Sequence, residues 1–87
     1  MERIEKPIAL VLISRSPHTN SAEIAAKISQ ISGIKLVYEL TGNTDIVAFL
    51  HAKRMNPDGN AIVDQIRKVP GVDETDTKVI LNEVKRP

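Results

Sequence analysis

Two short apolar runs, IALVL at residues 8–12 and IVAFL at residues 46–50, decide the fold, and they align at an offset of 38 residues. Each run has the length of a strand and is apolar on both faces, which is typical of a strand in the middle of a sheet. A stripe of helical spacing follows each run at the same offset, with Ile24, Ile28 and Ile31 matched by Ile62, Ile66 and Val69. The chain is therefore a duplicated unit of strand and helix.

The helix boundaries follow from capping residues. The first helix is expected to begin at Asn20, which with Glu23 has the spacing of an N-cap and N3 pair, and to end at Gly33. The second is expected to begin at Asn56-Pro57, an N-cap followed by proline at the first helical position, and to stop at Pro70-Gly71. Both helices have one apolar face, so each must lie on a sheet.

Two more polar strands complete the unit. Residues 35–40 and 77–84 alternate as edge strands do, and residues 41–44 form a tight turn between the two halves. The order β-α-β-β-α-β predicts an α+β fold, the ferredoxin-like plait, as one domain over residues 1–87. Its sheet is antiparallel and four-stranded, with the first and third strands central and both helices on one face.

The second face of this sheet needs a cover. About six apolar side chains at roughly 1.5–2 kcal/mol each would forfeit on the order of 10 kcal/mol if they stayed wet. We therefore expect a two-fold dimer with sheets packed face to face, although another partner chain could cover the face instead. The expected interface residues are Val11, Ile13, Val47 and Phe49.

Composition excludes several classes of function. The 87 residues carry a net charge of +1, no cysteine and 2% aromatic residues, which argues against nucleic-acid binding, disulfide scaffolds and thiolate metal sites. The N-terminal apolar run, residues 8–13, is too short for a signal peptide or a membrane span, so we expect a cytoplasmic protein. No cofactor or metal is expected.

Catalytic signatures are nearly absent. His18 and His51 have no cysteine or second histidine at ligand spacing, and Ser14 and Ser16 lack a nucleophile elbow. No phosphate-binding loop occurs. The acidic cluster before the last strand is expected to be a solvated turn; it comprises Asp73, Glu74 and Asp76.

The turn between the halves is the candidate binding site. Gly42 and Asn43 are explained by the backbone of a tight turn, but Asp45 stands at the mouth of an apolar strand, where a carboxylate is costly unless paired or wet. Outward backbone N–H groups beside a carboxylate offer donors for an anion and an acceptor for a cation. That combination suits the zwitterionic end of an α-amino acid.

Two stretches resemble the Lrp/AsnC family of transcriptional regulators. Residues 31–47, ISGIKLVYELTGNTDIV, resemble the family's PGV-x-x-x-Y-x-x-TG-x-[YF]-D stretch, and residues 66–80 resemble its second stretch, I-x-x-[IL]-PGV-x-x-T-x-T. The resemblance is to the C-terminal regulatory (RAM) domain. It implies a plait that dimerises through its sheets, assembles into an octamer or decamer, and binds amino acids between dimers. The implied ligand-binding residues are Gly42, Asn43, Thr44, Asp45 and Thr77.

Two departures from the family limit what the resemblance implies. Few residues precede the first strand, so no helix-turn-helix is expected, no direct DNA binding follows, and a full-length regulator becomes a candidate partner. Thr44 stands where the family has an aromatic residue, which removes a wall of the pocket.

Three functions are therefore open. The first is a stand-alone amino-acid sensor, and the second is an oligomerising adaptor whose turn binds nothing. The third is a small dimeric α/β-barrel enzyme, similar to monooxygenases and isomerases. Such enzymes need three polar residues on the inner faces of their strands, and this chain has at most His51 for that role. An acylphosphatase needs an arginine in a glycine-rich first loop, and this chain has Arg15 but no glycine there.

Overall fold

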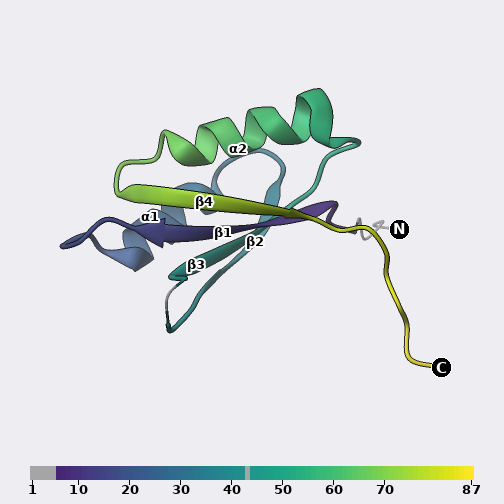
Figure 1. Cartoon of the computed structure of the whole chain (residues 1–87). Helices are drawn as coiled ribbons and strands as arrows, with labels where there is room; N and C mark the ends of the chain where they lie inside the picture. The colour runs from purple at the N-terminus through teal and green to yellow at the C-terminus, as the bar shows by residue number, and fades with distance from the viewer. Residues whose placement is uncertain (1–5, 43) are drawn as a thin grey trace.

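A computed structural model describes residues 6–42 and 44–87 of the chain. The elements follow one another in the predicted order, with a short irregular helical turn before the second helix (Figure 1). They are β1 (Ala9–Arg15), α1 (Ser21–Ser29), β2 (Ile34–Glu39), β3 (Ile46–Leu50), η1 (Met55–Gly59), α2 (Asn60–Arg67) and β4 (Val72–Val79). The predicted α+β, ferredoxin-like plait is confirmed.

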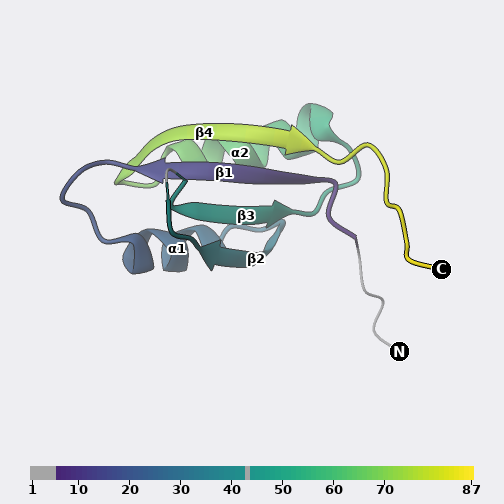
Figure 2. The same ribbon diagram turned by 60° about the horizontal axis from the view of Figure 1, so that its bottom comes forward.

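The four strands form one antiparallel sheet in the order β2-β3-β1-β4 (Figure 2). The two apolar runs therefore occupy the centre, as predicted from their lack of a polar face, and the alternating strands lie at the edges. β4 differs from the predicted strand over residues 77–84, because it begins at Val72 and ends at Val79. Of the acidic cluster, Glu74 and Asp76 pair with β1 and Asp73 lies at the shift of register, so all three belong to the strand instead of forming a solvated turn. An edge strand can hold them because it can expose one face.

The helix caps explain where the helices begin. The Asn20 side chain accepts hydrogen bonds from the backbone N–H groups of Ala22 and Glu23, which confirms the predicted N-cap. α1 ends at Ser29, earlier than predicted, and a short turn leads on to Gly33. In the second half, Asn56 lies within η1 but has extended backbone angles, and no side-chain cap forms there. α2 itself begins at Asn60, later than the predicted start at Asn56-Pro57.

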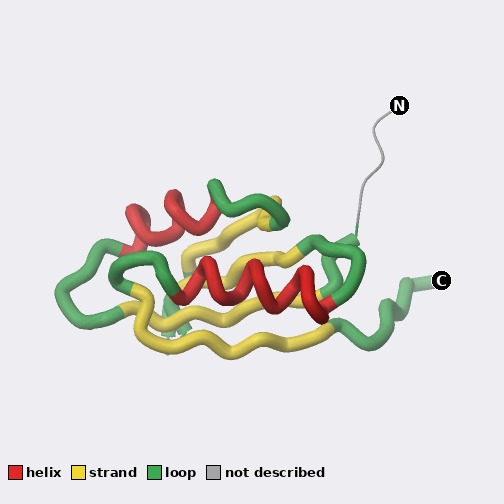
Figure 3. Tube along the Cα trace, turned by 90° about the horizontal axis from the view of Figure 1, so that it is seen from above, coloured by secondary structure: helices red, strands yellow, loops and turns green. Residues whose placement is uncertain are grey.

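Both helices lie on one side of the sheet, as Figure 3 shows from above. The core between the layers is apolar, and its largest fully buried side chains are Val11, Ile13, Ile28, Ile46, Leu50 and Ile66. This corrects the predicted dimer interface at Val11 and Ile13. Both side chains are fully buried under the helices because odd-numbered positions of β1 face the inner side of the sheet.

The two halves lock together through a reciprocal pair of contacts. Gly33 and Gly71 occupy equivalent places in the repeat and have φ of +98° and +96°. A Cβ at Gly33 would overlap Cδ1 of Ile62, and one at Gly71 would lie 2.7 Å from Cδ1 of Ile24. Ile24 and Ile62 are themselves equivalent in the repeat, so each half contributes the isoleucine that packs on the other half's glycine.

Candidate functional site

The predicted site lies at the turn between β2 and β3, beside the end of β1. Gly42 has φ of +101° and nothing within 4 Å of its would-be Cβ, so this part of the turn is open to solvent. The turn is closed by the Leu40 N–H, which donates to the Asp45 carbonyl at 2.7 Å, and is tied to β1 by the Asp45 N–H, which donates to the Ile13 carbonyl at 3.1 Å. Asn43, another of the predicted turn residues, lies outside the described residues.

The Asp45 carboxylate is engaged by Arg15. Its Oδ2 accepts a hydrogen bond from the Arg15 backbone N–H at 2.9 Å, and its Oδ1 lies 3.7 Å from Arg15 Nε. The Arg15 guanidinium also donates through Nη1 to the Thr19 carbonyl at 2.8 Å. Asp45 therefore has the partner that a carboxylate at this position requires, and the turn carries a positive group next to a negative one.

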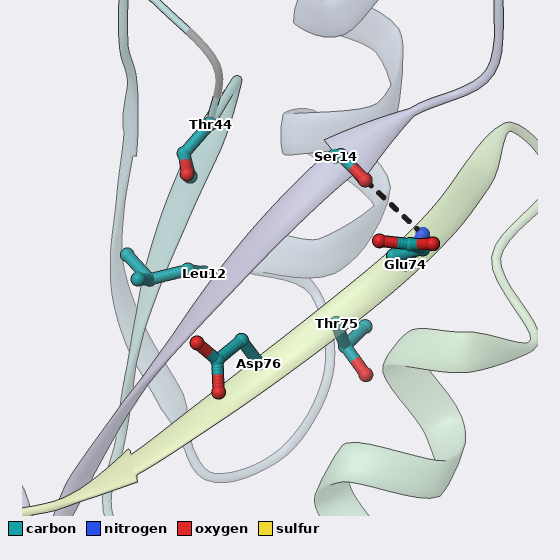
Figure 4. A pocket seen from close by; sticks show the side chains of 6 residues that line it. All are labelled: Leu12, Ser14, Thr44, Glu74, Thr75 and Asp76. Atoms are coloured by element: carbon teal, nitrogen blue, oxygen red, sulfur yellow. Dashed lines mark hydrogen bonds between the residues drawn. The ribbon is translucent and has the colours of Figure 1, made fainter.

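A hollow of about 150 Å³ opens next to this turn, on the side of the sheet away from the helices (Figure 4). Its lining comes from β1, β4 and the approach to β3, namely Leu12, Ser14, Thr44, Glu74, Thr75 and Asp76. Ser14 Oγ accepts from the Glu74 backbone N–H at 3.2 Å. The hollow therefore combines the hydroxyl groups of Ser14 and Thr44 and two carboxylates with one apolar side chain. The Thr75 side chain points the other way, toward α2, where its hydroxyl accepts from Arg67 Nε.

The predicted binding residues are only partly brought together. Thr44 lines the hollow, and Asp45 pairs with Arg15 beside it. Thr77 is opposite Val11 in the β1–β4 ladder, so its side chain belongs to the helix-facing side and not to the hollow. The family resemblance implied Thr77 as a ligand contact, and a shift of one residue along a strand decides the face.

Arg15 and the hollow's carboxylates were not expected at the site from the sequence. Arg15 is the last residue of β1, separated from the apolar run by Ser14. A cation at that end of the strand was the sequence signal for a partner of Asp45. The signal for Glu74 and Asp76 was their alternation, because residues two apart on a strand share a face. This shared face was not expected because Glu74 and Asp76 were predicted to lie in a solvated turn.

The sheet side away from the helices, here called the open face, is apolar near its middle. It is formed by Leu10, Leu12, Leu36, Tyr38, Val47 and Phe49, which the strand registers place side by side. The rings of Tyr38 and Phe49 meet edge to face at 6.1 Å, and Tyr38 is still 50% exposed. Val47 and Phe49, two of the residues predicted for a dimer interface, lie on this face, and Leu10 and Leu12 lie there with them instead of Val11 and Ile13.

The space between sheet and helices, which the enzyme reading needs as a pocket, is filled by aliphatic side chains. His51 lies at the end of β3, where its backbone N–H donates to the Gly33 carbonyl at 2.7 Å, and its buried Nδ1 has no partner within the described chain. His18 is exposed in the β1–α1 loop. Neither helix of the described residues has the length and hydrophobicity needed to cross a bilayer.

Comparison with known sequences identifies the family. The model of the Lrp/AsnC ligand binding domain matches residues 8–87. The HTH-type transcriptional regulator LysM of Saccharolobus solfataricus is 34% identical over 73 residues, which cover 84% of this chain and 51% of the regulator. Homocitrate synthase of Sulfurisphaera tokodaii is 32% identical over 76 residues, but these are only 16% of the synthase. The chain thus spans about half the length of the curated regulators that it matches.

Solved structures show the same fold. TTHA0845 from Thermus thermophilus superposes with a TM-score of 0.77 at 24% identity, covering 90% of this chain and 96% of that one. A transcriptional regulator of Neisseria meningitidis in complex with L-methionine gives 0.74 at 23% identity, covering 90% and 51%. AsnC of E. coli gives 0.75 at 16% identity, covering 91% and 54%. Together with the family match along nearly its whole length, these likenesses show that the chain belongs to the Lrp/AsnC ligand-binding domain family.

Proposed function

We propose that this domain senses a free α-amino acid at the β2–β3 turn and conveys the binding event through its state of assembly. The observation that carries the proposal is the opposed pair of charges at the turn, Arg15 and Asp45, beside the hollow that Thr44 lines. The family match and a structural relative solved with L-methionine support an amino acid as the ligand.

Each end of the zwitterion has a complementary group. The Arg15 side chain is 36% exposed, and its guanidinium can turn one of its N–H edges to an α-carboxylate, for which a planar fork is well suited. The Asp45 carboxylate uses Oδ2 for the Arg15 backbone N–H, which leaves Oδ1 able to accept from an α-ammonium group. The backbone around Gly42 is the third contact, open to solvent on the outer side.

The open face links the binding of the amino acid to the assembly of several copies of the domain. In this proposal, two copies pack through Leu10, Leu12, Val47 and Phe49, and dimers then associate around the ligand-binding turns into an octamer or decamer. A ligand held between dimers stabilises the assembly by mass action. Mixed assembly with a full-length regulator of the same family would carry the signal to DNA, without a DNA contact by this domain.

Thermal unfolding in the presence of each of the twenty amino acids, monitored together with light scattering, tests the proposal. A ligand at one hundred times its Kd adds about 2.7 kcal/mol to the free energy of unfolding. For a domain of this size that raises Tm by roughly 10–20 °C. A shift with at least one amino acid, accompanied by larger particles, is expected.

Arg15→Gln is the informative variant, because it removes the guanidinium but keeps the backbone N–H on which Asp45 depends. It should lose the amino-acid response while remaining folded. Arg67→Gln is the matched control, since Arg67 is an exposed arginine on α2 that contacts Thr75 on the helix side. No response by the parent at millimolar concentration of any amino acid, with the assembly intact, would establish the adaptor instead.

A further inference from the structure

The chain after β4 carries apolar side chains that touch almost nothing of their own domain. In this segment, called here the C-terminal arm (residues 80–87), Leu81 is 94% and Val84 is 88% exposed. No other large hydrophobic side chain of the described residues exceeds 50%. Two such residues within one short segment indicate an interaction surface rather than scattered exposure.

The arm is held in a definite direction. Its first residue continues the ladder, as the Ile80 N–H donates to the Ile8 carbonyl at 2.9 Å. Further along, Glu83 accepts from Lys6 Nζ at 2.9 Å. Beyond the sheet, the arm bends away from the helices toward the side of the open face, without folding back on it (Figures 1 and 2).

The end of the arm is basic, and the hollow on the open face is acidic. Lys85 and Arg86 close the sequence before its last residue, and Glu74 and Asp76 line the hollow. Asp76 lies 3.2 Å from Lys78, but within the described chain the Glu74 carboxylate meets no cationic side chain. The two charge clusters are thus complementary, with one carboxylate left without a cation.

A single copy cannot join these clusters. Glu74 lies near the start of β4, roughly 16 Å of extended strand before Val79, and the arm continues away from it. A second copy can join them. If the two-fold axis between two face-to-face sheets runs across the strands, the end of one β4 lies over the start of the other.

We propose that the arm of each copy lies across the open face of a second copy, with Lys85 and Arg86 against the partner's carboxylates at 74 and 76. Leu81 and Val84 then pack on the apolar part of that face, which removes them from water. The inference rests on the proposed dimer and adds the segment that clasps it. Basic and acidic clusters also fix the relative direction of the two sheets.

Charge reversal tests this assignment by sedimentation of the full chain. Lys85→Glu with Arg86→Glu should weaken the dimer by about tenfold or more, and Glu74→Lys with Asp76→Lys should do the same. All four reversals in one chain should restore the dimer to within about threefold of the parent, because each arm again meets opposite charge. Lys53→Glu with Arg54→Glu is the matched control, with the same residue types and charge change in the β3–η1 loop, and should leave the dimer unchanged.

A second pair of substitutions tests the apolar part of the arm. Leu81→Asn with Val84→Asn should also weaken the dimer, without lowering the stability of the monomer, because both side chains are exposed there. The arm is refuted if reversal at 85 and 86 acts no differently from reversal at 53 and 54, or if the four reversals together add their losses. A parent chain that sediments only as a monomer would refute the proposed dimer along with the arm, whereas a dimer indifferent to every arm variant would refute the arm alone.

Discussion

Replacing Asp45 by alanine removes the side-chain contact between the candidate binding turn and β1, while the backbone bond from Asp45 N–H to the Ile13 carbonyl remains. Oδ2 of Asp45 accepts from the Arg15 backbone N–H at 2.9 Å, at the point where the β1–β4 register shifts between Ser14 and Arg15. That N–H is part-buried, so its loss of an acceptor is not fully repaired by water. The substitution therefore destabilises the domain even when no ligand is present.

The magnitude follows from two contributions. A hydrogen bond to a charged acceptor contributes about 1.5–3 kcal/mol, and partial exposure puts this one near the lower end. The ion pair adds little, about 0–1 kcal/mol, because the two side chains are 26% and 36% exposed and the N–O distance between them is 3.7 Å. We expect a loss of about 2 kcal/mol for Asp45→Ala, which lowers Tm by roughly 8–16 °C. Asp45→Asn keeps an oxygen acceptor and should lose about half as much.

Urea unfolding of the three chains, with and without the amino acid that stabilises the parent, measures both roles of Asp45. The structural role is measured by the drop in the urea midpoint of the variant without ligand. The binding role is measured by whether the ligand fails to raise that midpoint in the variant. Asp64→Ala is the control, because Asp64 is an exposed partner in a 3.8 Å pair with Arg67 and should change stability by no more than about 0.5 kcal/mol. An Asp45→Ala chain with the parent's midpoint would refute the structural reasoning, and one that still responds fully to ligand would remove Asp45 from the binding site.

Two further substitutions test the core and the open face. Gly33→Ala should lower the free energy of unfolding in urea by about 2–4 kcal/mol, because φ at this position is +98° and the new Cβ would overlap Ile62. Ile62→Val should recover part of that loss because it removes Cδ1. Equal losses with and without Ile62→Val would contradict the contact. Leu12→Asp or Phe49→Asp should give folded monomers, as measured by sedimentation and circular dichroism. Val11→Asp should unfold the chain because Val11 is fully buried. A folded dimer with Asp at both 12 and 49 would show that the open face is not the interface.

The sequence was sufficient for the fold because every strong signal agreed. Apolar runs, helical stripes and capping residues pointed to one arrangement, and the duplication supplied each signal twice. The sequence did not show which side of the first central strand faces the helices. IALVL is apolar at every position, so its pattern does not distinguish the two faces. For that reason the prediction placed Val11 and Ile13 on the face away from the helices, where Leu10 and Leu12 lie. The site was partly predictable, because the turn and Asp45 have a chemical signature, whereas the approach of Arg15 depends on strand pairing.

The duplication also explains where the proposed functional features lie. The halves are equivalent in their interior, where Gly33 packs on Ile62 as Gly71 packs on Ile24. They diverge directly after the edge strands. The chain leaving β2 turns back to form β3, which produces the tight turn with Gly42 and Asp45, while the chain leaving β4 extends as the C-terminal arm. The two segments proposed to bind a ligand and a second copy thus occupy equivalent places in the repeat, directly after its edge strands and outside the interior contacts that both halves share.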